Sequence, residues 1–306
     1  MRTLTFRAMG CSMLAAMDED SPRATERLAS VPKWFEAWEQ HLSRFRPDSE
    51  LNRVNLSAGN PVQLSETMWG VLQAALKASQ QSQGLAMPTL MQALENAGYD
   101  RSFEALADGV THAGQKRLPT NGQLKVTLLD EASCTIQLSP GARLDFGGVA
   151  KGCAAHQAMQ RLQAYAPALI NAGGDIAISG LRSDREPWPV GVDDPMHPDA
   201  QLVMLKLGRC GVATSGRDYR RWQQNGAWQH HIIDPRTGQP AETDVLSATV
   251  IAPDVRQAEM ATKTALILGS QAGLAWLEAH ASLAGMLLLE DGQVLQDSRF
   301  EKYIWR

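Results

Sequence analysis

The chain has 306 residues, of which 44% are hydrophobic and 20% are charged, a composition typical of a globular protein with a substantial core. Its formal net charge is -4, and no run of like charges marks a basic arm or an acidic tail. No apolar stretch approaches the roughly 18 residues of a membrane-spanning helix. We therefore expect neither a nucleic-acid partner nor a membrane span.

Four cysteines, Cys11, Cys134, Cys153 and Cys210, are widely spaced and form no CxxC pair. This spacing argues against a zinc ribbon or a disulfide framework and is typical of free thiols in a reducing compartment. The apolar stretch before Cys11 is interrupted by Arg7 and is shorter than the roughly 7–15 residues of a signal-peptide core. We therefore expect a cytoplasmic protein, or an exported one if an upstream leader has been removed.

In the first half of the chain, residues 3–16 mix β-branched, aromatic and small side chains around Gly10, which predicts a strand or a hairpin bent at the glycine. A helix is predicted from Ser21-Pro22 onward, because apolar residues recur at intervals of three or four. The predicted helices of this half cover 21–42, 49–54, 65–83 and 90–96. The charged segment 43–50 is either a surface turn or one wall of a ligand site, and on the sequence alone we favour the surface turn.

In the second half, residues 122–138 predict two strands, and further elements follow in clusters. Helices are predicted over 151–165 and 257–268, strands over 188–194, 201–207 and 245–252, paired strands within 167–180 and a final hairpin over 284–295. Helices and strands do not alternate strictly, and no repeat or linker separates two halves. The sequence therefore predicts an α+β fold in one domain, 1–306.

The segment 142–161, ARLDFGGVAKGCAAHQAMQR, is the leading candidate for a chemical centre. Gly147 and Gly148 allow a sharp turn and a close approach to a ligand, and the helix beginning near Val149 would direct its N–H groups at an anion such as phosphate. A glycine turn without chemical meaning explains this segment alone equally well. Two similar turns of small residues follow, but none fits an established phosphate-binding signature.

The adjacent histidines His230 and His231 are candidate metal ligands or bases. Neighbouring residues in a strand point to opposite faces, so at most one of the two faces a given site. On this pattern alone, a half-buried strand histidine is the simpler interpretation.

Eight segments, taken in order, resemble the ApbE family of FAD:protein FMN transferases, and the resemblance covers nearly the whole chain. The matching segments are Met9-Gly10, SRFRPDSELNRVN at 43–55, MPTL at 87–90 with ALENAGYD after it, LDFGGVAKG at 144–152, NAGGDIAISG at 171–180, VATSG at 212–216, HIIDPRTG at 231–238 and ATVIAP at 248–253. Each segment alone is a weak signal, but eight in the family's order make a strong one.

The resemblance implies a single ApbE-like domain with mixed or antiparallel sheets packed by helices. It implies an enzyme that binds FAD and Mg²⁺ and transfers FMN to a Thr or Ser hydroxyl of an acceptor protein with release of AMP, a post-translational flavinylation. Such chemistry needs charge neutralisation at a pyrophosphate and a base for the attacking hydroxyl. An FAD pyrophosphatase that gives FMN and AMP, or a flavin-binding or flavin-delivery protein without catalysis, fits the same residues.

The resemblance also implies roles for individual residues. Those expected to hold the flavin nucleotide are Gly147, Gly148, Lys151, Gly173, Gly174 and Asp175. Those expected to border the flavin or adenine, or to lie in the same cleft, are Met9, Ser49, Glu50, Leu51, Thr214, Ser215 and Gly216. His231 is the expected catalytic base because of its place in the HIIDPRTG segment, and it also belongs to the FAD-binding set.

The expected magnesium site departs from the family pattern, which has the carbonyl at Ala150, an Asp and, four residues later, a Thr. Here the Asp position is Glu259, to which a catalytic role is also assigned, and the Thr position is Lys263. An ammonium has no lone pair to donate to a metal, so Thr262 is the expected substitute ligand. Alternatively, Lys263 could lie near the pyrophosphate and replace part of the metal's charge.

Two further polar positions depart from the family pattern. His156 stands where the family has an Asp five residues after the lysine, and Met87 stands where an Asp precedes Pro-Thr. These departures bear on catalysis more than on the fold.

Overall fold

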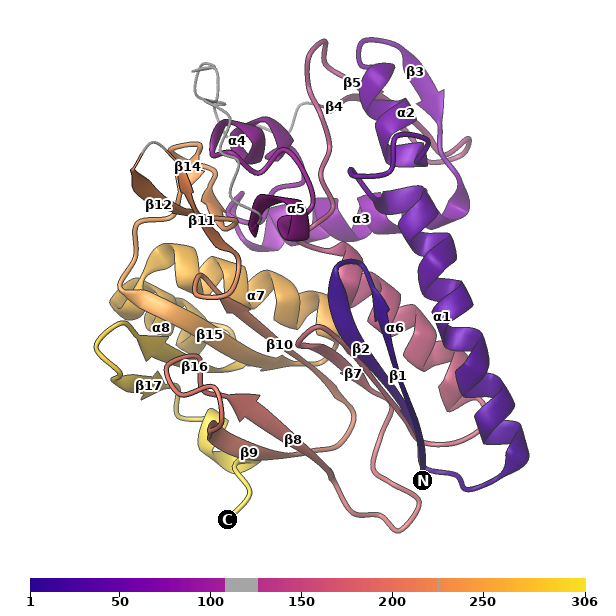
Figure 1. Ribbon diagram of the computed structural model, residues 1–306, viewed down its shortest axis with the longest axis vertical. Helices are drawn as coiled ribbons and strands as arrows, with labels where there is room; N and C mark the ends of the chain where they lie inside the picture. The colour runs from indigo at the N-terminus through magenta and orange to yellow at the C-terminus, as the bar shows by residue number, and fades with distance from the viewer. Residues whose placement is uncertain (108–125, 225) are drawn as a thin grey trace. The chain divides into compact units, whose positions relative to one another are not determined.

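The computed structural model of the chain describes residues 1–107, 126–224 and 226–306 (Figure 1). It divides into two compact units, each assembled from separate segments. Unit 1 comprises Met1–Phe35, Lys151–Tyr219 and Thr243–Arg306, and unit 2 comprises Glu36–Ala150 and Arg220–Glu242. A single domain over 1–306 stays a prediction, and each unit is described by itself.

Unit 1 is organised around an eight-stranded sheet in the order β1-β2-β6-β7-β10-β15-β16-β17, in which every neighbouring pair is antiparallel. Its strands are β1 (Arg2–Ala8), β2 (Cys11–Met17), β6 (Ala168–Ala172), β7 (Asp175–Ile178), β10 (Cys210–Gly216), β15 (Val245–Ala252), β16 (Ala284–Leu289) and β17 (Val294–Gln296). Met9 and Gly10 form the tip of the β1–β2 hairpin, and their φ angles of 49° and 66° are those of a type I′ turn.

One face of this sheet packs against the hairpin of β8 (Trp188–Asp193) and β9 (Gln201–Leu207). Their apolar side chains form one core cluster with Val212 and Ile251 of the sheet and with Phe300 of the 3₁₀ turn η1 (Phe300–Tyr303). Because successive strand residues point to opposite faces, the neighbours of Val212 face the other side of the sheet.

The other face carries α7 (Val255–Leu268), which contacts β10 and β15 (Figure 1). Asp254 caps this helix by accepting hydrogen bonds from the N–H groups of Arg256 and Gln257. A Cβ atom on Gly211 would lie 1.9 Å from the backbone nitrogen of Val255, so only glycine lets the helix start against the strand. The helices α6 (Ala150–Gln163) and α8 (Ser270–Ala279) complete the unit, with α8 packed on α7 and β16.

The described residues of unit 2 form helices and three small sheets. Helix α1 (Pro22–Leu42) begins in unit 1 and ends in unit 2, where it is followed by α2 (Glu50–Leu56), α3 (Glu66–Gln81), α4 (Met91–Asn96) and α5 (Phe103–Ala107). The sheets are β3-β5-β4 (Pro61–Gln63, Thr135–Leu138, Val126–Asp130), β11-β12 (Arg221–Gln224, Ala227–His230) and β13-β14 (Ile233–Asp234, Gln239–Pro240). Tyr99 and Trp222 stack at 5.2 Å between ring centroids in one of its core clusters.

The predicted α+β class is confirmed. The six predicted helices correspond to α1, α2, α3, α4, α6 and α7, each with ends within two residues of the prediction. Helices α5 and α8 and the hairpins of residues 221–240 were not predicted, and residues 122–125 of the predicted strand pair lie outside the described part. No helix in residues 1–107, 126–224 and 226–306 is long and apolar enough to cross a bilayer.

Candidate functional site

Unit 1 holds four charged side chains that pair with one another, which we call the charge cluster: Lys151, Asp175, Glu259 and Lys263. The ammonium of Lys151, in the first turn of α6, donates to the carboxylate of Asp175 at the start of β7. Lys263 lies one turn after Glu259 in α7, and its Nζ is 3.2 Å from Glu259 Oε1. The two carboxylates are 1% and 0% exposed, whereas each lysine keeps 18% of its side chain exposed.

The charges within the cluster stabilise one another. Burial disfavours the ammonium of Lys151, but the carboxylates of Asp175 and Glu259 outweigh it and raise the pKa of Lys151 above its ordinary value. Burial, reinforced by the charge of Asp175, raises the pKa of Glu259, and Lys263 and Lys151 oppose this rise. With all four groups ionised the cluster has no net charge, which reduces the cost of burying it.

Both carboxylate oxygens of Glu259 have donors. Oε1 accepts from Lys263, and Oε2 accepts from the backbone N–H of Gly152 at 3.1 Å, in the first turn of α6. A Cβ atom on Gly152 would lie 2.6 Å from Oε2, so the glycine is required for this approach. A first-turn amide of α6 is thus bound by a carboxylate of the protein itself.

The hydroxyl of Thr262 is also engaged in hydrogen bonds with the protein. It donates to the backbone carbonyl of Glu259 at 2.9 Å and lies 2.8 Å from the hydroxyl of Ser215 on β10. Since the proton of Thr262 goes to the carbonyl, Ser215 is the donor in the second contact, and the Thr262 oxygen accepts it.

These contacts decide whether the predicted ligands fit a magnesium ion. A divalent cation needs oxygen atoms that face it, but both oxygens of Glu259 and the hydroxyl of Thr262 already accept hydrogen bonds from the protein, and the ammonium of Lys263 lies beside the carboxylate. Within the described ranges, no group of three His, Cys, Asp or Glu side chains could hold a metal ion. Ala150, whose carbonyl was the third predicted ligand, is the first residue of α6. The arrangement around Glu259 does not fit magnesium.

The glycine pair before Asp175 forms the tight turn between β6 and β7. Gly173 and Gly174 have φ angles of 63° and 94°, a region that favours glycine. A Cβ atom on Gly173 would also lie 2.7 Å from the Cβ of Cys11, while the Cδ of Lys151 is 4.0 Å from the same position. The turn therefore needs both glycines for its own geometry, and it lies beside Lys151.

The three predicted residues at the end of β10 do not share one face. Ser215 points toward α7, where it meets Thr262, whereas the hydroxyl of Thr214 lies 2.9 Å from that of Thr249 on β15. Thr214 and Ser215 thus face opposite sides of the sheet. Gly216 ends the strand, and a Cβ atom there would lie 2.2 Å from Oδ1 of Asp218. Only Ser215 is linked to the helix that carries the charge cluster.

In unit 2, the predicted residues 49–51 hold helices together. Ser49 caps α2 by accepting from the N–H of Asn52, and Leu51 is fully buried. Glu50 accepts from the backbone N–H and the hydroxyl of Ser65, the N-cap of α3, and from His41 of α1. These contacts need no ligand, and the expectation that the three residues border the flavin stays a prediction.

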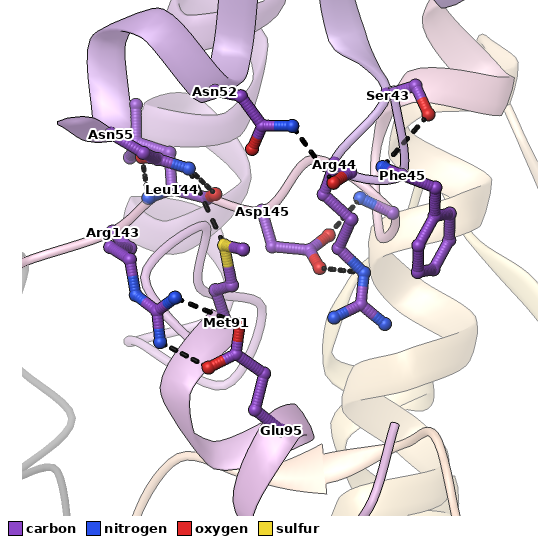
Figure 2. Close-up of polar contacts among 11 residues, drawn as sticks. Ser43, Arg44, Phe45, Asn52, Asn55, Met91, Glu95, Arg143, Leu144 and Asp145 are labelled. Atoms are coloured by element: carbon purple, nitrogen blue, oxygen red, sulfur yellow. Dashed lines mark hydrogen bonds and ion pairs between the residues drawn. The ribbon is translucent and has the colours of Figure 1, made fainter. Parts of the chain in front are cut away.

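The interpretation of 43–50 as a surface turn is wrong for Arg44 (Figure 2). Its Nε lies 3.1 Å from Oδ2 of Asp145, and the two side chains are only 7% and 8% exposed. Asp145 also accepts from the N–H of Gly147 at 2.5 Å. The guanidinium lies 4.4 Å from the ring centroid of Tyr99 and 4.5 Å from that of Phe45.

Sequence reasoning did not single out Arg44 or Asp145 as partners. The available signal was that both residues lie inside matched segments, SRFRPDSE and LDFGGVAKG. The Nη2 atom of Arg44 is buried and has no hydrogen-bond partner among the described residues. The Asp145 carboxylate fixes the turn that contains Gly147, so this ion pair positions part of the predicted nucleotide-binding segment.

The adjacent histidines have different surroundings. His230 ends β12, where its Nε2 lies 3.1 Å from the carbonyl of Ala241 and its Nδ1 accepts from the N–H of Ile232 at 3.3 Å. These partners fix one tautomer and give His230 a structural role. His231 follows the strand at a bend and is half-buried. Its role as the base stays a prediction.

The sequence model of the ApbE family matches residues 9–287. The chain belongs to the ApbE family. It is 32% identical to the FAD:protein FMN transferase of Treponema pallidum, over 89% of this chain and 80% of that protein. It is 30% identical to a protein of the same name from Klebsiella pneumoniae, over 89% of this chain and 85% of that protein. These relatives show that the ApbE chain is an enzyme, as predicted.

Solved ApbE structures share the fold. An ApbE protein from Thermotoga maritima superimposes with a TM-score of 0.83 at 24% identity, covering 100% of this chain and 99% of that one. The flavin transferase ApbE from Vibrio cholerae gives a TM-score of 0.78 at 21% identity, covering 99% and 98%. The predicted ApbE-like arrangement of helices and sheets is thereby confirmed.

Two other departures of this ApbE chain from the expected pattern are accommodated without charge. His156 has a buried Nδ1 with no hydrogen-bond partner among the described residues, and burial together with Arg256 lowers the pKa of its imidazole. The hydroxyl of Ser79 lies 3.3 Å from the sulfur of Met87. A neutral imidazole and a thioether thus stand where the family pattern has carboxylates.

Proposed function

We propose that this ApbE-family enzyme transfers FMN from FAD to a Thr or Ser hydroxyl of an acceptor protein and releases AMP. The observation that carries the proposal is the 32% identity to a FAD:protein FMN transferase over 89% of the chain. In the reaction, the acceptor oxygen forms a bond to the FMN phosphorus, the bond to the oxygen of AMP breaks, and the acceptor proton passes to a base.

Lys151 is the residue that we assign to the pyrophosphate of FAD. Asp175 fixes its ammonium and helps to raise its pKa, so it stays protonated at neutral pH. The Cδ of Lys151 lies 4.0 Å from the position that a Cβ atom on Gly173 would take, and the absence of that atom allows a close approach to the backbone. A fixed cation there would stabilise the charge that develops on the phosphoryl oxygens.

We assign the base to His231 and retain Glu259 as a residue required for activity through its hold on Lys263. An imidazole is the side chain that most often serves as a general base in enzymes. The other residues proposed to contact FAD are Met9, Ser49, Glu50, Leu51, Gly147, Gly148, Gly173, Gly174, Asp175, Thr214, Ser215 and Gly216. Magnesium does not enter this proposal, because the residues around Glu259 do not fit it.

The test is an incubation of the purified protein with FAD and a candidate acceptor, followed by AMP release and in-gel flavin fluorescence. Covalent flavin on the acceptor supports the transferase. AMP and FMN without labelling would instead indicate an FAD pyrophosphatase, and FAD binding without AMP would indicate a flavin-binding protein.

A matched pair of variants tests the base. His231→Asn should lower the transfer rate by about two to four orders of magnitude while FAD still binds. His197→Asn is the control, because His197 is exposed and pairs only with Asp194 among the contacts described. Equal rates for the two variants would remove His231 from the mechanism.

A further inference from the structure

We propose that Lys263 takes the place of a divalent cation beside Glu259, so that the charge cluster of this chain binds the pyrophosphate of FAD without a metal at that position. The inference rests on the proposed function and deepens it, because it concerns how the same enzyme handles the charge of its substrate. It departs from the magnesium site that the family resemblance implies.

The ammonium of Lys263 lies close to two oxygen atoms of Glu259. Lys263 Nζ lies 3.2 Å from Oε1 of Glu259 and 3.5 Å from its backbone carbonyl oxygen. These are two oxygens of the kind that a hard cation would use. The remaining N–H groups of the ammonium are not needed by Glu259, and part of the side chain is exposed. Two oxygens of Glu259 thus hold the ammonium, while the Lys263 side chain as a whole keeps 18% of its surface exposed.

The charge balance of the cluster disfavours an additional dication. Two carboxylates already face two ammonium groups, and the carboxylate of Asp254, the N-cap of α7, is matched by the guanidinium of Arg256 at 3.2 Å. A divalent ion would add two positive charges with no negative charge left to compensate them, next to Lys263. In contrast, a pyrophosphate would bring negative charge to two ammonium groups whose side chains are partly exposed.

The hydroxyls do not offer an alternative metal site. Thr262 donates to the Glu259 carbonyl and accepts from Ser215, so its oxygen is already engaged. The substitution of Thr262 for the missing ligand, expected from the sequence, would require its hydroxyl to bind a metal while Lys263 lies beside the same Glu259. Lys263 needs no such rearrangement.

Three variants of Lys263 separate charge from metal binding. Lys263→Thr removes the ammonium and supplies an oxygen ligand beside a carboxylate that has lost its cation. Lys263→Met removes the ammonium and supplies no oxygen. Lys263→Arg keeps the positive charge and is the conservative control. Circular dichroism and thermal unfolding establish that each variant is folded.

The first readout is metal binding, followed by the electron paramagnetic resonance of Mn²⁺ with and without FAD. We expect no Mn²⁺ bound to the wild type or to Lys263→Met, and one bound ion in Lys263→Thr. Stoichiometric Mn²⁺ binding to the wild type, alone or together with FAD, would overturn the inference. If a variant fails to fold, this wild-type measurement still decides.

The second readout is FAD affinity, from the quenching of flavin fluorescence in the presence of a chelator or Mg²⁺. Wild type and Lys263→Arg should bind FAD equally well in both conditions. Lys263→Thr should bind about tenfold more weakly in chelator, as expected for the loss of one charge-assisted hydrogen bond, and recover with Mg²⁺. Loss of wild-type affinity on chelation would contradict the inference.

These outcomes are independent of the proposed function. If no acceptor is labelled and no AMP is released under any condition, flavin transfer is wrong for this chain, but the Mn²⁺ and FAD titrations still report on Lys263. If transfer occurs only with added metal, the transferase stands and the inference falls.

Discussion

Each unit contains ion pairs with buried carboxylates, and the units differ in the exposure of the basic side chains in these pairs. In unit 1, the lysines of the charge cluster remain partly exposed while their carboxylate partners are buried. In unit 2, Arg44 and Asp145 are both buried. Aromatic rings contact the Arg44 guanidinium, and the Asp145 carboxylate accepts a hydrogen bond from the N–H of Gly147. The first arrangement agrees with our proposal that the charge cluster presents positive charge to a ligand, whereas the second has the surroundings of a structural ion pair.

If the unit 2 pair is structural, its loss should produce the largest change in stability. Asp145→Ala leaves the Arg44 guanidinium buried without a carboxylate, and we expect a loss of about 3–5 kcal/mol. Chemical denaturation followed by circular dichroism measures it. A loss below about 1 kcal/mol would mean that Arg44 relaxes into water and would break the comparison.

The control for this prediction is an exposed pair in the same unit. Arg46 binds Glu36 with Nη1 2.5 Å from Oε1, at the surface of α1. Glu36→Ala should cost about 1 kcal/mol or less, because exposed ion pairs are screened by water. The difference in burial between the two ion pairs would then account for the different stability losses of Asp145→Ala and Glu36→Ala.

The glycine turn beside the charge cluster should give a smaller effect. Gly173→Ala places a side chain at a φ of 63° and against Cys11, and we expect a loss of about 1–3 kcal/mol. The matched control is Gly180→Ala, because a Cβ atom added to Gly180 would have no other atom within 4 Å and the φ of Gly180 is not left-handed. Similar melting temperatures for the two variants would show that the turn does not require Gly173 and would leave close approach to a ligand as its reason.

The local features of the fold were predictable because short-range chemistry determines them. Ser21, Ser49 and Ser65 precede apolar repeats and cap α1, α2 and α3 in the structure. The Met9-Gly10 tip of the first hairpin was predictable for the same reason. In contrast, the hairpins of 221–240 depend on contacts such as Trp222 Nε1 with the carbonyl of Ala97, 125 residues earlier in the chain.

The site was predictable as a list of residues but not as a set of contacts. The family segments identify Lys151 and Asp175, and the family's metal-site pattern identifies Glu259, whereas their pairing depends on β7, α6 and α7 coming together. Sequence also left two interpretations of Lys263 open, because a spacing of four residues permits contact with Glu259 but does not require it. The burial of Arg44 was missed because a charged segment between helices normally lies at the surface.

The last prediction concerns two buried carboxylates whose pKa values shift in opposite directions. Burial raises the pKa of Glu259. Burial also disfavours the Glu50 carboxylate, but the hydrogen bonds from Ser65 and His41 outweigh it and hold the pKa of Glu50 below its ordinary value of 4.5. A lowered pKa contributes stability that is present above the unfolded-state value and is lost as the pH falls through the folded-state value.

For Glu50 we therefore expect a pH-dependent contribution to stability that is present above 4.5 and is lost as the pH falls below 4.5 through the lowered folded-state pKa. The Glu50→Gln variant cannot ionise, so the difference in unfolding free energy between wild type and variant should shrink over this range. Denaturation at each pH measures that difference. A difference that stays constant would show that Glu50 acts through the shape of its contacts and not through its charge, and the contrast with Glu259 would then rest on burial alone.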